Sequence, residues 1–260
     1  ALVKEIHQKA VQREPMPHFF QVVGVDRPTG ATSAATALGY VADPSTVHVN
    51  ERLADDADQL PLTLVHEYVH VVQKRTDAVS RLETSVPNAN TTDGDIVRTS
   101  VLEGAAVTAE TRYWERHEYT GTSPAEGMKQ SYAATEGARQ WIYAPYYVGY
   151  EYVQARSHSP ATMDVLYDDP PHTSEELIHG LPGGSEPLPP LSVDVRSTDW
   201  TVNGTDRTGE LFVRVALDSE LESERAATAA AGWGTDTRAT LTDGNDRAYV
   251  WALRWDDAAN

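Results

Sequence analysis

Five consecutive residues, His66-Glu67-Tyr68-Val69-His70, restrict the possible folds of this chain more than any other segment does. The residues around them predict a helix over 60–76, because apolar side chains recur along it and no glycine or proline follows Pro61. Residues four apart share a face of a helix, so both imidazoles can reach one metal ion. Glu67 stands beside the first imidazole, where a carboxylate can take a proton from water. This spacing is typical of zinc peptidase sites.

A third protein ligand is expected, because a catalytic zinc site uses three side chains and keeps one position for water. The metzincin and aspzincin patterns are excluded, since Gln73 and Thr76 stand where those patterns need other residues. The remaining common solution is a glutamate on a following helix, which the sequence predicts over 95–117. Glu103 is the preferred ligand, because a carboxylate among small and apolar residues needs a partner. Glu110, among polar residues, is the weaker candidate.

The residues after Glu103 bear on how this helix packs. Gly104 and the alanines that follow it are expected to let the helix approach the motif helix closely enough to share a metal. If Glu103 is not a ligand, we expect it to pair with an arginine such as Arg98.

The remaining pattern predicts an α+β protein that is helix-dominated around the motif, with a small N-terminal sheet and a C-terminal α/β extension. Further helices are expected at 2–13, 145–156, 173–180 and through most of 208–231. Strands are expected at 19–25, in a hairpin over 36–50, and at 237–241 and 247–255, and residues 191–202 are expected to be extended. The Pro/Gly-rich segment 183–190 predicts a linker between a metallopeptidase domain, 1–182, and a C-terminal subdomain, 191–260, packed on it.

The composition limits the classes of partner that the protein can bind and indicates the environment in which it works. The net charge is −18, which argues against nucleic acid as a partner, so none is expected. Lysine occurs only at positions 4, 9, 74 and 129, and an acidic, lysine-poor chain is typical of adaptation to high salt. Cysteine is absent, so disulfides and thiol catalysis are excluded. No segment is long and apolar enough to span a membrane, and the first residues predict an amphipathic helix rather than a signal peptide. Two sequons, Asn90-Thr91-Thr92 and Asn203-Gly204-Thr205, hint at export.

The motif together with Glu103-Gly104-x-Ala106 resembles the gluzincins, the thermolysin-like zinc peptidases. The hairpin around Gly39-Tyr40 resembles the edge strand that precedes the motif helix in small gluzincins. Three later segments resemble a poorly characterised family of predicted metallopeptidases that includes exported haloarchaeal surface proteins: Pro145-Tyr146-x-x-Gly149, 170–179 and 229–236. In that family the second segment usually ends His-Pro, whereas here His179 precedes Gly180. The resemblance implies a zincin-like fold and an extracellular or cell-surface location.

The residues and the resemblance together predict a zinc-dependent hydrolase that cleaves peptide bonds in peptides or proteins. His66, His70 and Glu103 are expected to bind Zn2+, and Glu67 is expected to act as general base on a metal-activated water. The oxyanion needs a donor besides the metal, and the candidates are His179, Tyr146, Tyr147 and His172.

His179 is our first choice as that donor, so residues 170–179 are expected to lie against the zinc cleft, and Tyr146 is the next choice. A cap for the end of its own helix is the alternative role for His179. For the whole chain, two alternatives remain. One is a non-catalytic exported surface or binding module that keeps a zinc site, and the other is a zinc hydrolase of a non-peptide substrate.

Overall fold

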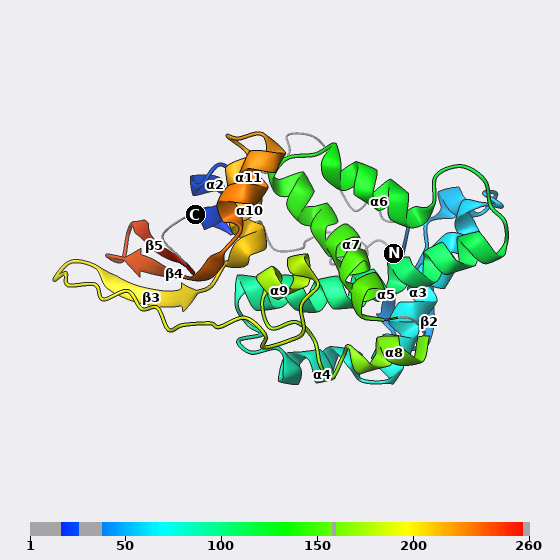
Figure 1. The fold of residues 1–260 in the computed structure, drawn as a ribbon, viewed down its shortest axis with the longest axis horizontal. Coiled ribbons are helices and arrows are strands. Elements are labelled where there is room, and N and C mark those ends of the chain that lie inside the picture. Colours follow the sequence, from blue (N-terminus) through cyan, green and yellow to red (C-terminus); the bar gives the residue numbers. More distant parts are fainter. Residues whose placement is uncertain (1–16, 26–37, 158–159, 257–260) are drawn as a thin grey trace.

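The computed structural model describes residues 17–25, 38–157 and 160–256, and over these residues the fold is α+β, as predicted. Helices make up most of an elongated body, and a three-stranded sheet extends from one end of it (Figure 1). The helix predicted at 2–13 lies outside the described residues. No helix in the described part of the chain is long and apolar enough to cross a membrane.

The two helices predicted to carry the metal ligands are both present. Helix α3, Gln59–Arg75, contains the motif, and helix α5, Thr92–Arg116, contains Glu103. The start of α3 is fixed by the Asp56 carboxylate, which accepts a hydrogen bond from the backbone N–H of Gln59. Helix α5 begins where the Thr91 hydroxyl accepts one from the N–H of Gly94. At the start of both helices, a side chain from a preceding residue therefore accepts a hydrogen bond from a free backbone N–H group.

Helix α5 lies between α3 and a third long helix, α7, Gly137–Arg156. Gly104 and Gly149 make the contact with α7 possible. A Cβ on Gly104 would lie 2.2 Å from the backbone carbon of Gly149, and one on Gly149 would lie 2.0 Å from the carbonyl oxygen of Ser100. The prediction that Gly104 serves the approach to the motif helix is therefore wrong, because Gly104 faces α7.

The predicted two-stranded hairpin is present, and it packs on the motif helix. Strands β1, Gly39–Asp43, and β2, Thr46–Val49, pair antiparallel and both contact α3. The Tyr40 and His48 side chains are cross-strand neighbours, and their rings stack at 4.5 Å between centroids. The hairpin thus places Gly39, at the start of β1, beside the motif.

One predicted strand and one predicted helix start differ from the structure. Residues 18–22 form helix α2, His18–Val22, and not a strand. Phe19 and Phe20 are both buried, and a strand would point consecutive side chains to opposite faces, whereas a helical turn lets both face the core. Pro145 lies inside α7 instead of starting it. The residues before Pro145 include Ala138 and Ala144, which are buried, and this packing outweighs the missing hydrogen bond.

The other helices are shorter and surround the three long ones. They are η2, Glu51–Leu53; α4, Ala78–Ser85; α6, Pro124–Ala133; α8, Pro160–Val165; α9, Ser174–His179; α10, Gly209–Asp218; and α11, Ser223–Ala230. Helix α9 begins at Thr173, whose hydroxyl accepts a hydrogen bond from the N–H of Glu176, and ends at Gly180 with φ +66°. The predicted cap and stop signals of α9 are therefore confirmed.

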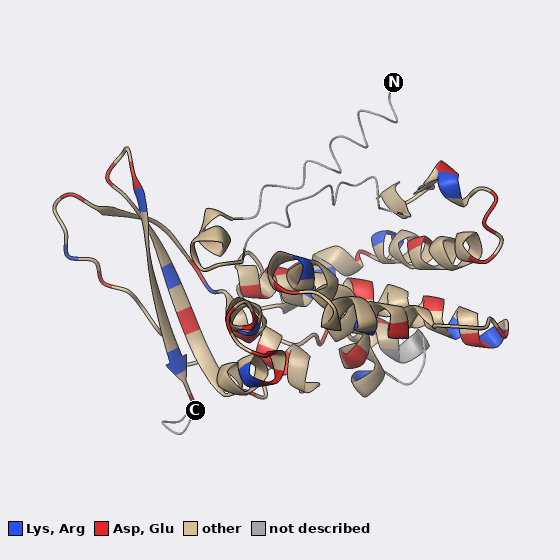
Figure 2. Ribbon diagram, turned by 90° about the horizontal axis from the view of Figure 1, so that it is seen from above, with Lys and Arg blue, Asp and Glu red and all other residues tan. Residues whose placement is uncertain are grey.

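The C-terminal sheet has the order β3-β4-β5, with both pairs antiparallel. Its strands are β3, Thr201–Asp206; β4, Trp233–Thr242; and β5, Arg247–Trp255. The two predicted C-terminal strands are confirmed: β5 has the predicted bounds, and β4 begins four residues earlier and ends one residue later than predicted. Figure 2 shows acidic residues on most helices and few basic ones, in keeping with the net charge of −18.

Helix α10 packs the C-terminal segment onto the helical body. Leu211 belongs to the same buried cluster as Val97 of α5, while Phe212 packs with Phe19 and Phe20. At the start of α5, the buried Asp93 carboxylate accepts a hydrogen bond from Arg207 Nε at 3.0 Å. The segment 198–256 is thereby joined to the first turn of the helix that carries Glu103.

Candidate metal centre

Three side chains from two helices meet at one point on the inner side of α3. The ligand atoms that His66, His70 and Glu103 can offer all lie within 4.8 Å of one another, and no other such group occurs among the described residues. The two histidines lie one turn apart on α3, and Glu103 reaches them from α5. The fold therefore brings together the three residues that the sequence singled out as metal ligands.

The distances within this group fit a tetrahedral ion. Nε2 of His66 lies 3.2 Å from Glu103 Oε2, and Nε2 of His70 lies 3.3 Å from the same oxygen. Four ligands at bond lengths of about 2.0–2.1 Å around Zn2+ are separated from one another by about 3.3 Å. The two nitrogen–oxygen distances are close to this spacing, and all three ligand atoms lie within 4.8 Å of one another, so the group could hold a metal ion.

The charges around the group also favour a cation. Burial would lower the pKa of His66, but hydrogen bonds to Glu103 and Glu110 outweigh it and raise that pKa to about 10. Burial would raise the pKa of Glu103, yet its contacts with His66 and His70 lower it to about 2. The carboxylates thus create a field strong enough to keep a proton on an imidazole. A dication in the same place meets the same attraction.

The other ring nitrogen of each histidine is also held. Nδ1 of His66 lies 3.3 Å from Oε2 of Glu110, two helical turns beyond Glu103 on α5. Glu110 therefore does not belong to the group of possible metal ligands, and its carboxylate contacts the other nitrogen of the His66 ring. Such partners fix the ring so that Nε2 points at the metal.

Gln73 performs the same task for His70. Its Oε1 lies 2.7 Å from Nδ1 of His70, and its amide nitrogen donates to the Leu102 carbonyl and the Tyr167 hydroxyl. Sequence reasoning considered Gln73 only as an excluded ligand position and missed this role. The signal was its place three residues after His70, on the same helical face.

We expect Glu110→Gln to weaken zinc binding by about 10- to 100-fold, because the neutral amide polarises the His66 ring less than the carboxylate does. Competition with a chelator of known affinity measures the change. Glu115→Gln, an exposed change on the same helix, is the matched control and should leave zinc affinity unchanged. Equal affinities for the two variants would show that Glu110 does not act on the metal centre.

Glu67 lies next to the three ligands without joining them. Its side chain is 6% exposed, and no donor among the described residues forms a hydrogen bond with its carboxylate. Burial raises its pKa, and the positive histidines oppose that rise. A buried carboxylate whose oxygens accept no hydrogen bond from the described residues, beside a possible metal site, can accept a proton from water.

Tyr146 is the one predicted oxyanion donor that the described contacts bring to the centre. It follows Pro145 on α7, and its ring lies 6.2 Å from the His66 ring between centroids, inclined by 29°. Tyr147 points elsewhere, because its ring packs with Tyr132 of α6. His172 packs beside Gly183 and Gly184.

The prediction for His179 has to be corrected. Its Nε2 lies 3.1 Å from Oε2 of Glu210, a fully buried residue of α10, and this hydrogen bond raises the pKa of His179. Helix α9 is anchored at the first turn of α5, where the N–H of Ser174 donates to Asp93, about 15 Å along the helix from Glu103. We therefore remove His179 and the segment 170–179 from the site.

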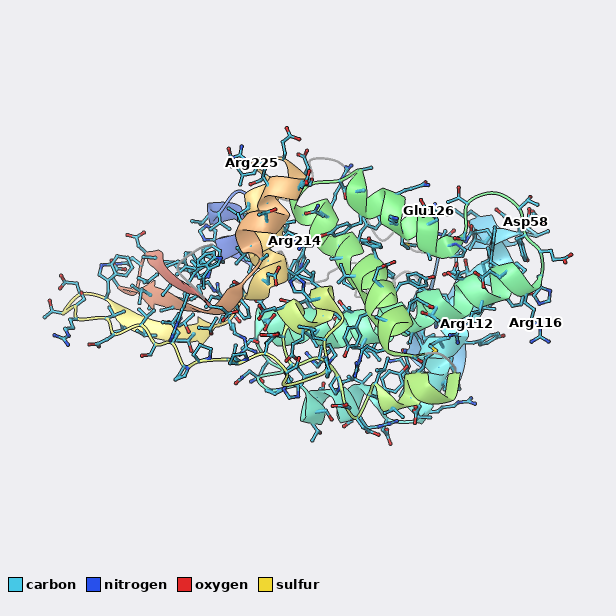
Figure 3. All side chains as sticks on the ribbon, in the orientation of Figure 1. Asp58, Arg112, Arg116, Glu126, Arg214 and Arg225 are labelled. Carbon is cyan, nitrogen blue, oxygen red and sulfur yellow. The ribbon has the colours of Figure 1, made fainter. Side chains whose placement is uncertain are left out.

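Helix α10 lies toward the end of the molecule that carries the C-terminal sheet, and α3 lies toward the other end (Figure 1). Figure 3 places Arg214 of α10 on the side of the C-terminal sheet, whereas Arg112 and Arg116 mark the far end of α5. Helix α3 packs against α5 and not against α10. The predicted alternative partner of Glu103, Arg98, binds Asp95 and Glu83 instead.

Comparison with known proteins adds one finding. Residues 198–260 match the model of a family described as a domain of unknown function, DUF8575. This match covers less than half of the chain and does not include the ligands on α3 and α5. A search of curated proteins and of solved structures found no match.

Proposed function

We propose that this protein is a zinc-dependent hydrolase of peptide bonds in which Glu67 acts as general base. The observation that carries the proposal is the convergence of Nε2 of His66, Nε2 of His70 and Oε2 of Glu103, with the Glu67 carboxylate beside them. A zinc ion bound there would supply a Lewis acid that lowers the pKa of water to about 7.

The chain's own residues account for the remaining steps. Glu67 takes a proton from the attacking water and passes it to the leaving amine. Tyr146, whose ring lies beside that of His66, would donate its hydroxyl hydrogen to the developing oxyanion. Glu110 and Gln73 keep the histidine rings oriented throughout, since each holds an Nδ1 atom.

The main alternative is a non-catalytic module that keeps a zinc site for structure. The position of Glu67 favours the enzyme. A structural site has four protein ligands and no need for an unpaired buried carboxylate beside them, whereas here three ligand atoms meet and the Glu67 oxygens stay free of hydrogen bonds from the described residues.

Metal removal tests the proposed activity. We expect the protein to cleave members of a peptide library in molar salt, to lose that cleavage after chelation, and to regain it with one equivalent of Zn2+. Molar salt is chosen because a net charge of −18 is best screened there. Mass spectrometry of the digest identifies the cleaved bonds. Zinc-loaded, folded protein that cleaves no peptide in the library would favour the non-catalytic module.

A further inference from the structure

The start of strand β1 forms a wall against the Glu67 side chain. A Cβ placed on Gly39 would lie 2.9 Å from both Cγ and Oε1 of Glu67 and 3.1 Å from Cδ. Carbon atoms in ordinary contact stay about 3.5–4.0 Å apart. The backbone of Gly39 therefore occupies the space beside the carboxylate so closely that no larger residue fits without moving it.

The backbone of Gly39 is held in place by the rest of the hairpin. Gly39 pairs with Val49 across the hairpin, and next to it the N–H of Asn50 donates to the Leu38 carbonyl at 2.8 Å. Both strands also pack on α3. Because the hairpin is held at this end, a clash at Gly39 is relieved more easily by the flexible end of Glu67 than by the strand.

Nothing else among the described residues holds the carboxylate in place. Glu67 has no hydrogen-bond donor there, in contrast to Glu103 and Glu110, which contact imidazole nitrogens. Its side chain is nonetheless almost completely buried. Among the described residues, packing therefore sets the position of its oxygens, and the backbone of Gly39 forms part of this packing.

We infer that Gly39 is a positioning residue for Glu67: the bare backbone of β1 sets where the general base stands, and only glycine at this position leaves it there. The catalytic consequence of this inference rests on the proposed function. The packing contact between Gly39 and Glu67 does not depend on that function. Any side chain at position 39 would displace the carboxylate by about 0.5–1 Å. A displacement of that size is enough to misalign a proton transfer.

The catalytic consequence is tested with Gly39→Ala in the zinc-loaded enzyme. We expect kcat to fall by about a hundredfold, with KM and zinc content unchanged, because only the base has moved. Gly127→Ala is the matched control: a Cβ there comes no closer than 4.0 Å to Thr122, and kcat should stay at the wild-type value. A kcat for Gly39→Ala within twofold of Gly127→Ala would overturn the inference.

The packing itself is tested without activity, by thermal unfolding of metal-free protein. Gly39→Ala should lower Tm, and adding Glu67→Ala should restore about 2–4 °C of that loss, because it removes the side chain that the new methyl group meets. Glu67→Ala combined with Gly127→Ala should show simple additivity. Additive effects of Gly39→Ala and Glu67→Ala would refute the contact even if the wild-type protein cleaves nothing. Coupling without any wild-type cleavage would leave the packing established and refute the proposed function alone.

Discussion

Glu67→Gln is expected to lower peptide hydrolysis by about 10²- to 10⁴-fold while zinc stays bound. The amide has nearly the shape of the carboxylate but cannot take a proton from water, and loss of a general base costs about 10²- to 10⁴-fold. Glu67 is not one of the three side chains whose ligand atoms meet, so the metal should remain. Initial rates on a cleaved library peptide and zinc-to-protein ratios, measured on the same sample, check both parts.

Variants of the ligands provide the contrast. His66→Ala, His70→Ala and Glu103→Ala should each lose zinc along with activity, since each removes one of three protein ligands. Wild-type rates for Glu67→Gln on a verified substrate would show that another group acts as the base. Loss of zinc in Glu67→Gln would instead make Glu67 part of the binding site.

Gly149→Ala should destabilise the fold by about 3 kcal/mol or more and lower Tm by about 6–12 °C. The new methyl group would lie 2.0 Å from the carbonyl oxygen of Ser100, a backbone atom that can move only if α5 and α7 separate. Separation also shifts Glu103, next to Gly104 in this contact, so zinc affinity should fall as well. Denaturant unfolding of the metal-free protein and chelator competition measure the two effects.

Gly127→Ala again serves as the control. It makes the same change in the middle of α6, where the new Cβ has open space, and helix propensity predicts a gain of about 1 kcal/mol. Gly149→Ala with wild-type stability would mean that α5 and α7 are not in backbone contact, and the account of how Glu103 is placed would be wrong.

The local patterns in the sequence were sufficient to predict the elements of the candidate site. The spacing of His66 and His70 brings their imidazoles together only on a helix. The apolar residues around the motif predict that helix, and the structure contains it. Glu103 could be selected because its neighbours are small and apolar, and the structure places its oxygen between the two imidazoles. The hairpin over β1 and β2 followed from alternation and a turn.

Longer-range features could not be read in the same way. The partners of Nδ1 in both histidines, Glu110 and Gln73, depend on the rotation of α3 relative to α5, which periodicity does not define. His179 was misplaced because a capped helix with two histidines fits either an active site or a packing role. Its actual partner, Glu210, follows in the sequence only after a long irregular segment. Phe19 and Phe20 were assigned to a strand because their helical turn is stabilised by tertiary contacts with Phe212.

Anomalous diffraction at the zinc edge, from crystals of the protein grown with one equivalent of Zn2+, tests the central claim most directly. We predict a single strong peak within about 2.0–2.2 Å of Nε2 of His66, Nε2 of His70 and a carboxylate oxygen of Glu103, with Glu67 outside the coordination sphere. A peak coordinated by other residues, or no peak in protein that is folded and saturated with zinc, would contradict the account.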